Sequence, residues 1–185
     1  MNEYELKILD FIHEHLTCRF LDAVMPIITK FGDGGIFWIA VALVFIIIKK
    51  TRKTGISMGT ALLIGLIIGN IILKNSFARI RPYDLNTAIR PDLLVKALSD
   101  YSFPSGHTLA SFEAATVLLI RDKRFGIPAV ILAVLIAFSR LYLYVHYPSD
   151  VLAGAILGTF IGFLSCKLID KIFEKIEERR QLKTK

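Results

Sequence analysis

The sequence predicts an all-α protein that folds as a polytopic transmembrane helical bundle, with five spanning helices and an N-terminal amphipathic helix that can pack as a sixth. Hydrophobic residues make up 54% of the 185 residues, a larger share than soluble domains carry. They are concentrated in five nearly continuous apolar runs separated by charged segments. Five such runs in so short a chain decide the fold class; they are residues 35–48, 56–73, 108–120, 127–143 and 151–169.

The lengths of the runs fit a membrane better than a soluble core. A spanning helix needs roughly 20 apolar residues, with about 17 as the lower limit. The runs 56–73, 127–143 and 151–169 reach that length, whereas 35–48 and 108–120 need flanking residues to cross the bilayer. One short run alone would indicate a buried core helix. Five together predict a membrane protein.

The N-terminal pattern, in residues 4–31, differs in kind. Apolar residues recur in steps of three or four with charged residues between them, which predicts an amphipathic helix. We expect it to lie on the outer leaflet or to pack across the bundle, with His13 and His15 on its solvated face, and the FGDGG sequence at 31–35 to end it. Its apolar residues are Leu9, Ile12, Leu16, Phe20, Val24, Ile27 and Phe31.

The distribution of positive charge predicts which helix ends face the cytoplasm, where short basic loops concentrate. Three basic segments, at residues 49–53, 121–124 and 167–185, alternate correctly along the chain and can all be inside. They hold 14 of the 23 Lys and Arg residues with 5 acids, which leaves 9 bases and 11 acids in the rest of the chain. We therefore expect a cytoplasmic C-terminus, with the N-terminal segment and the connection 73–104 outside.

The length indicates one domain, and we assign residues 1–170 to a single membrane-embedded domain and 171–185 to a charged cytoplasmic tail near anionic headgroups. Glycines at four-residue spacing allow helices to approach closely in lipid. We favour packing within one monomer over a dimer interface, and the sequence leaves the oligomeric state open. These glycines are Gly65, Gly69, Gly154, Gly158 and Gly162.

Three polar clusters carry the chemistry, and the predicted topology puts all three at the outer face. One follows the second apolar run, one begins the third run, and one lies between the last two runs. Taken singly, each has an ordinary explanation as a helix anchor, a helix cap or a structural pair. Together they hold three cations, two imidazoles, a carboxylate and a Gly-containing helix start. They are Lys74 and Arg81; Pro104, Ser105, Gly106 and His107; and Ser139, Arg140, His146 and Asp150.

This inventory fits phosphoryl transfer. A phosphate ester needs its charged oxygens neutralised, and Arg offers bidentate donation for this purpose. The free N–H groups of a first helical turn, around Ser105, Gly106 and His107, form an anion site. One imidazole can attack phosphorus if a carboxylate fixes its tautomer, and the other can protonate the departing oxygen. Asp150 lies four residues after His146, which favours His146 as the nucleophile, although other carboxylates can approach either ring.

Other chemistries find less support. The sequence has no HExxH, no paired DxD and no Cys/His grid with ligand spacing, so we expect no metal and no cofactor. A nucleotide loop of the GxxxxGK[ST] type is missing too, and nothing favours nucleic-acid binding. Cys18 and Cys166 match no metal spacing, and we expect both to be free thiols.

In order along the chain, the clusters resemble the signature of a known superfamily. Lys74–Arg81–Pro82 matches K-x6-RP, residues 104–107 read PSGH, and 139–150 matches SR-x5-H-x3-D. This is similar to the type-2 phosphatidic acid phosphatase and vanadium haloperoxidase superfamily, and the flanking helices fit its small bacterial integral-membrane branch. The signature spans residues 74–150. A haloperoxidase is disfavoured because those relatives are soluble.

The resemblance implies a role for each phosphate-binding position. Lys74, Arg81 and Arg140 would bind phosphate oxygens, and Ser105 and the Gly106 amide would assist.

It also implies a catalytic set that works without a metal. His146 would be the nucleophile that forms a phosphohistidine, Asp150 would orient it, and His107 would be the general acid. Ser139 fits the pattern either as a phosphate contact or as a packing residue. Glu113 lies six residues into the third apolar run, where a carboxylate is costly. We expect it to pair with an Arg or Lys, to shape a pocket below the phosphate site, or to shift the pKa of His107.

We therefore expect a metal-independent lipid phosphatase of the bacterial cytoplasmic membrane, with its active site outside. The resemblance favours undecaprenyl diphosphate as the substrate, while phosphatidylglycerol phosphate and phosphatidic acid stay open. The expected partners are a membrane lipid phosphate and the bilayer. Two alternatives belong to other classes: a transporter would need ionisable groups along a midplane path, and an inactive scaffold would have lost some of the chemical positions.

Overall fold

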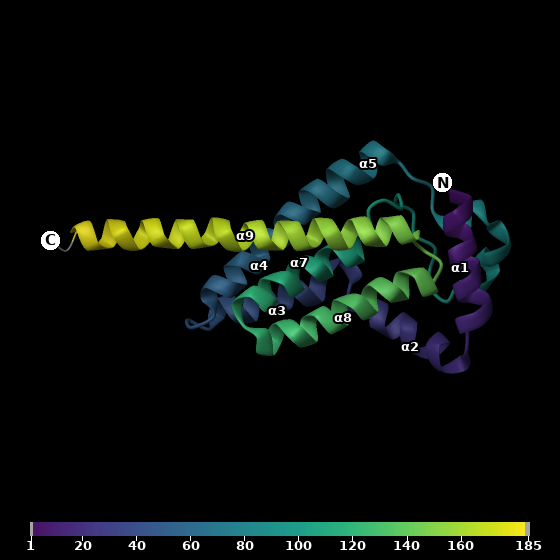
Figure 1. The fold of residues 1–185 in the computed structure, drawn as a ribbon, viewed down its shortest axis with the longest axis horizontal. Helices are drawn as coiled ribbons and strands as arrows, with labels where there is room; N and C mark the ends of the chain where they lie inside the picture. The colour runs from purple at the N-terminus through teal and green to yellow at the C-terminus, as the bar shows by residue number, and fades with distance from the viewer. Residues whose placement is uncertain (1, 184–185) are drawn as a thin grey trace.

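The computed structural model describes residues 2–183, and every regular element in this part of the chain is a helix (Figure 1), which confirms the predicted all-α fold. The elements are α1 (Asn2–Leu16), α2 (Arg19–Lys30), η1 (Asp33–Gly35), α3 (Ile36–Ile47), α4 (Arg52–Gly65), η2 (Leu66–Leu73), α5 (Lys74–Phe77), α6 (Pro82–Leu85), η3 (Thr87–Asp92), α7 (Gly106–Arg121), α8 (Lys123–Tyr142) and α9 (Pro148–Lys183).

Helix α7 forms the centre of the bundle, where it packs against α4, α8 and α9 (Figure 1). The glycines of α9 make this contact possible. A Cβ atom on Gly158 would lie 2.5 Å from the carbonyl oxygen of Leu109, and one on Gly162 would lie 2.8 Å from that of Glu113. Such approaches are too close for any larger residue, so the glycine spacing in α9 serves packing within the monomer, as predicted.

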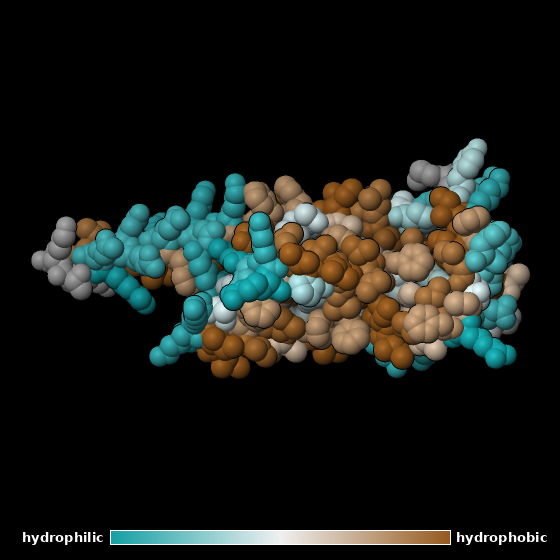
Figure 2. Space-filling view, turned by 60° about the horizontal axis from the view of Figure 1, so that its bottom comes forward, coloured by the Kyte–Doolittle hydropathy of each residue, from teal (hydrophilic) through white to brown (hydrophobic). Residues whose placement is uncertain are grey.

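Within residues 2–183, four stretches are long and apolar enough to cross a membrane: Arg19–Ile47, Arg52–Leu85, Lys123–Tyr142 and Pro148–Leu182. The remaining predicted span is α7, which has only 16 residues and is largely buried by its neighbours. Apolar side chains cover the middle of the molecule, and hydrophilic side chains gather towards its two ends (Figure 2). The segment predicted as a tail continues α9 beyond the bundle (Figure 1).

The N-terminal segment differs from the single helix that the sequence predicted. It breaks at Cys18, whose backbone is extended, into α1 and α2. Leu9 and Ile12 of α1 and Met25 of α2 are all buried in one apolar cluster at the end of the bundle. A straight helix over residues 4–31 would be about 42 Å long and could not place both halves on that cluster. As a result, α1 lies across the end of the bundle (Figure 1).

Candidate active site

The three polar clusters meet at the end of the bundle that α1 crosses. A cavity of about 760 Å³ opens there, and residues from all three clusters line it: Lys74, Arg81, Gly106, His107 and His146. The rest of its wall comes largely from apolar residues of α3, α4 and η2. The cavity therefore joins a polar end to an apolar groove between helices.

The polar end includes the start of α7. Ser105 precedes the helix and is fully buried; its backbone N–H donates to the carbonyl oxygen of Asp150 over 3.1 Å, and its hydroxyl accepts from Thr108 over 3.0 Å. These contacts fix the first turn of α7 against α9. A Cβ on Gly106 would lie 2.8 Å from Oδ1 of Asn70, so glycine lets the Asn70 side chain approach this turn closely. The N–H groups of this turn have no acceptor within the helix.

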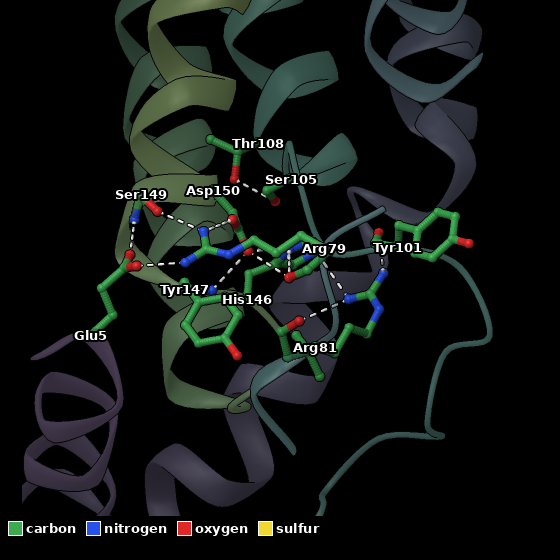
Figure 3. Close-up of polar contacts among 12 residues, drawn as sticks. Glu5, Arg79, Arg81, Tyr101, Ser105, Thr108, His146, Tyr147, Ser149 and Asp150 are labelled. Carbon is green, nitrogen blue, oxygen red and sulfur yellow. Dashed lines mark hydrogen bonds and ion pairs between the residues drawn. The ribbon is translucent and has the colours of Figure 1, made fainter. Parts of the chain in front are cut away.

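His146 and Asp150 form a buried pair beside this turn. Nδ1 of His146 lies 3.5 Å from Oδ2 of Asp150, and neither side chain is more than 2% exposed. The same oxygen accepts the hydroxyl of Ser102 and the backbone N–H of Tyr147 (3.0 Å) (Figure 3). The other ring nitrogen, Nε2, is 3.3 Å from Nη1 of Arg81. Burial and the positive charge of Arg81 lower the pKa of His146 well below its usual range, so the ring is neutral.

Lys74 and Arg81 converge on one carboxylate, that of Asp100. Lys74 pairs with Oδ2, and Nη2 of Arg81 donates to Oδ1 over 2.7 Å. Burial alone would raise the pKa of Asp100, but the hydrogen bonds and charges of Lys74 and Arg81 lower it to about 2. Arg140 is buried and donates through Nη1 to Thr29. An anion that binds these cations must therefore share them with Asp100 or displace it.

His107 has a carboxylate partner that sequence reasoning missed. Its Nε2 lies 2.8 Å from Oδ1 of Asp33, at the start of η1. A Cβ on Gly32 would lie 2.6 Å from Cδ2 of His107, so the small residue admits the ring. The available signal was an acid between glycines in FGDGG, a segment that we predicted only to end a helix.

Glu113 and Ser139, the two positions considered for the pocket, differ in their placement. Glu113 lines the cavity, is 1% exposed and packs against Gly65; its Oε1 has no hydrogen-bond partner among residues 2–183. Within that range no Arg or Lys pairs with it. Ser139 does not line the cavity. Its buried hydroxyl donates to the carbonyl oxygen of Ile136 in its own helix over 2.6 Å. The structure therefore supports packing as the function of Ser139.

These features define a membrane-embedded helical protein with a buried His–Asp pair beside a cavity that is lined by two cationic side chains. The sequence model of the PAP2 superfamily matches residues 54–174, which is more than half of the chain. The chain therefore belongs to the PAP2 superfamily.

Related proteins agree with this assignment. The chain is 38% identical over 150 residues to the undecaprenyl-diphosphatase of Sulfolobus acidocaldarius, covering 80% of this chain and 70% of that protein. It is 31% identical over 150 residues to the undecaprenyl-diphosphatase BcrC of Bacillus subtilis, covering 81% and 76%. The crystal structure of a transmembrane PAP2 type phosphatidylglycerolphosphate phosphatase from Bacillus subtilis superposes with a TM-score of 0.73 and 27% identity, covering 92% of this chain and 86% of that one.

Proposed function

We propose that this protein removes the terminal phosphate of a polyprenyl diphosphate through a phosphohistidine and without a metal. Undecaprenyl diphosphate is the substrate that we favour. The coarser assignment, a membrane lipid phosphatase, rests on its superfamily and on its relatives. The observation that carries the proposal is the position of Nε2 of His146. It lies beside Arg81 in a cavity that continues as an apolar groove.

The polar end of the cavity supplies a site for one phosphate. Lys74 and Arg81 line it, and Arg140 adds a third positive charge from its buried position near His146. The start of α7 brings the backbone N–H of Gly106, while Ser105, whose own N–H is bonded to Asp150, holds the turn in place. We assign the terminal phosphate to this site. Its binding requires Asp100 to give up some of its bonds to the cations.

The chemistry then follows in two steps. In the first step, Nε2 of His146 attacks phosphorus, the bond from phosphorus to the bridging oxygen breaks, and His107 protonates that oxygen as the lipid monophosphate leaves. Asp150 holds Nδ1 of His146 and stabilises the charge that the ring gains. In the second step, water attacks phosphorus while His107 takes a proton from the water, which restores His107 as an acid. The bond from phosphorus to Nε2 breaks, inorganic phosphate leaves, and the ring of His146 returns to its neutral form. Asp33 holds His107 in place for both steps.

The apolar groove supports a lipid as the leaving group. Its walls on α3 and α4 are formed mostly by residues such as Leu43 and Leu62, and burial of an apolar chain there gains roughly 0.8 kcal/mol per methylene. Two relatives are named for undecaprenyl diphosphate, which favours that lipid. The structural neighbour is named for phosphatidylglycerolphosphate, so that lipid is the first competitor to test.

The test is phosphate release by the purified protein in detergent from a panel of lipids, with and without EDTA. We expect release from undecaprenyl diphosphate to be fastest and to survive EDTA. Faster phosphate release from phosphatidylglycerol phosphate or phosphatidic acid would identify that lipid as the preferred substrate instead. Activity lost with EDTA would contradict the metal-free mechanism, and no release from any of the lipids would contradict the phosphatase itself.

We also propose that the active site faces the outside of the cytoplasmic membrane, which the charge distribution supports. Cys18 is exposed at the junction of α1 and α2, whereas Cys166 is buried. We expect a membrane-impermeant thiol reagent to label the native protein in intact cells, and Cys18→Ser to abolish the labelling. If Cys18 reacts only after the cells are opened, the orientation is reversed.

A further inference from the structure

Arg79 joins the His146–Asp150 pair to the N-terminal helix (Figure 3). Its Nη1 pairs with Oδ1 of Asp150 and donates to the Ser149 hydroxyl over 2.7 Å. Its Nη2 lies 2.5 Å from Oε2 of Glu5 in α1. The other Glu5 oxygen accepts the backbone N–H of Ser149 over 2.8 Å. Glu5 thus holds both Arg79 and the start of α9.

The charges in this network are buried. The side chain of Asp150 is 0% exposed, that of Glu5 is 11% exposed and that of Arg79 is 14% exposed. The guanidinium of Arg79 also stacks on the ring of Tyr147, 3.9 Å from its centroid. A buried carboxylate without a cation is strongly unfavourable. Arg79 supplies a positive charge to Asp150, and Glu5 balances the charge of Arg79.

The two oxygens of Asp150 have different partners. Oδ1 pairs with Arg79, while Oδ2 accepts Ser102 and the Tyr147 amide and faces Nδ1 of His146. The partners on Oδ2 other than the imidazole are neutral groups. A carboxylate held by these contacts cannot rotate freely, so Oδ2 stays turned to His146.

We propose that Arg79 is a positioning residue, which pairs with Oδ1 of Asp150 and so keeps Oδ2 turned to His146, and that Glu5 of α1 holds Arg79 in place. The inference rests on the proposed roles of His146 and Asp150. It adds α1 to the active site, although α1 lies outside residues 54–174 that the superfamily match covers. Burial alone would raise the pKa of Glu5, but hydrogen bonds from Ser149 and Arg79 lower it, which keeps this acid charged as the network requires.

The test compares Arg79→Gln with Arg79→Lys, which keeps the charge. Both variants retain the other charged or titratable groups around the His146–Asp150 pair. These groups are Glu5, Lys74, Arg81, His107, Arg140 and Tyr147. We expect Arg79→Gln to lower kcat on the order of 10-fold to 100-fold, as for outer partners that orient metal ligands, with little change in KM. Arg79→Lys should recover most of this loss.

Glu5→Gln tests the tether from α1. It should lower kcat several-fold, less than Arg79→Gln does, because Arg79 keeps its charge but loses its support. Glu3→Gln is the matched control, because Glu3 lies exposed in the same helix, and it should behave as the wild type. Melting temperatures in detergent show whether each variant folds.

The outcomes are distinct. A folded Arg79→Gln protein with wild-type kcat or with a change in KM alone, or an Arg79→Lys protein no better than it, would overturn the positioning role. If Arg79→Gln fails to fold, Arg79→Lys and Glu5→Gln decide: wild-type kcat in Glu5→Gln together with loss in Arg79→Lys would also overturn it. Failure of the proposed function is seen separately, as a wild-type protein that releases no phosphate.

Discussion

Replacement of His146 by Ala is expected to abolish the covalent phosphoenzyme and to lower phosphate release by about 10⁴-fold or more, as the loss of a nucleophile does in other covalent enzymes. The reason is geometric, because Nε2 of His146 faces Arg81 at the cavity. Among the imidazoles within residues 2–183, no other is a neutral ring held by a buried carboxylate. The measurement is rapid quenching with labelled substrate, followed by a test of the trapped adduct, which should be labile in acid and stable in base.

Two further variants make the His146 result interpretable. His146 is fully buried, so His146→Asn, which is closer to imidazole in size and polarity, should be compared with the Ala variant in case the latter unfolds. His15→Ala removes an exposed imidazole on α1 and should leave the phosphoenzyme unchanged. A phosphoenzyme that persists in a folded His146 variant would place the nucleophile elsewhere.

Replacement of His107 by Ala is expected to have an effect that depends on the leaving group. With a lipid phosphate the leaving oxygen needs a proton, and the loss should be about 10²-fold to 10⁴-fold, the usual worth of general acid catalysis. With an activated aryl phosphate such as p-nitrophenyl phosphate, the leaving group departs unprotonated, so the first step should slow far less. The measurement is the ratio of the two rates of phosphoenzyme formation in the wild type and in the variant.

Asp33→Asn gives a matched control for the His107 assignment. It leaves the imidazole in place but removes the charge 2.8 Å from Nε2, so we expect a smaller loss with the same dependence on the leaving group. If His107→Ala slows phosphoenzyme formation equally with the two substrates, His107 binds phosphate rather than transferring a proton. A loss in Asp33→Asn alone would mean that the carboxylate acts in another way.

The fold class could be predicted from local patterns alone. Apolar runs and basic segments indicated the helices and their ends, and five of the predicted helices are present. The prediction was wrong at Cys18, where the N-terminal helix breaks. The apolar periodicity over residues 4–31 was correct for each half, but periodicity carries no information about a bend. The bend lets Leu9 and Met25 reach the same buried cluster. The turn follows from tertiary packing at the end of the bundle.

The polar site likewise has a part that local sequence patterns predict and a part that depends on tertiary packing. The sequence by itself determined the helix start at Ser105 and Gly106, the three cations, and the four-residue step from His146 to Asp150, because each lies within a short signature or beside a helix end. The tertiary structure decided which acids reach them. Asp33 meets His107 across 74 positions, and Glu5 meets Arg79 across another 74. Those pairs form because α1 folds over the end of the bundle and the FGDGG turn closes onto α7, and long-range contacts of this kind depend on packing that local spacing does not encode.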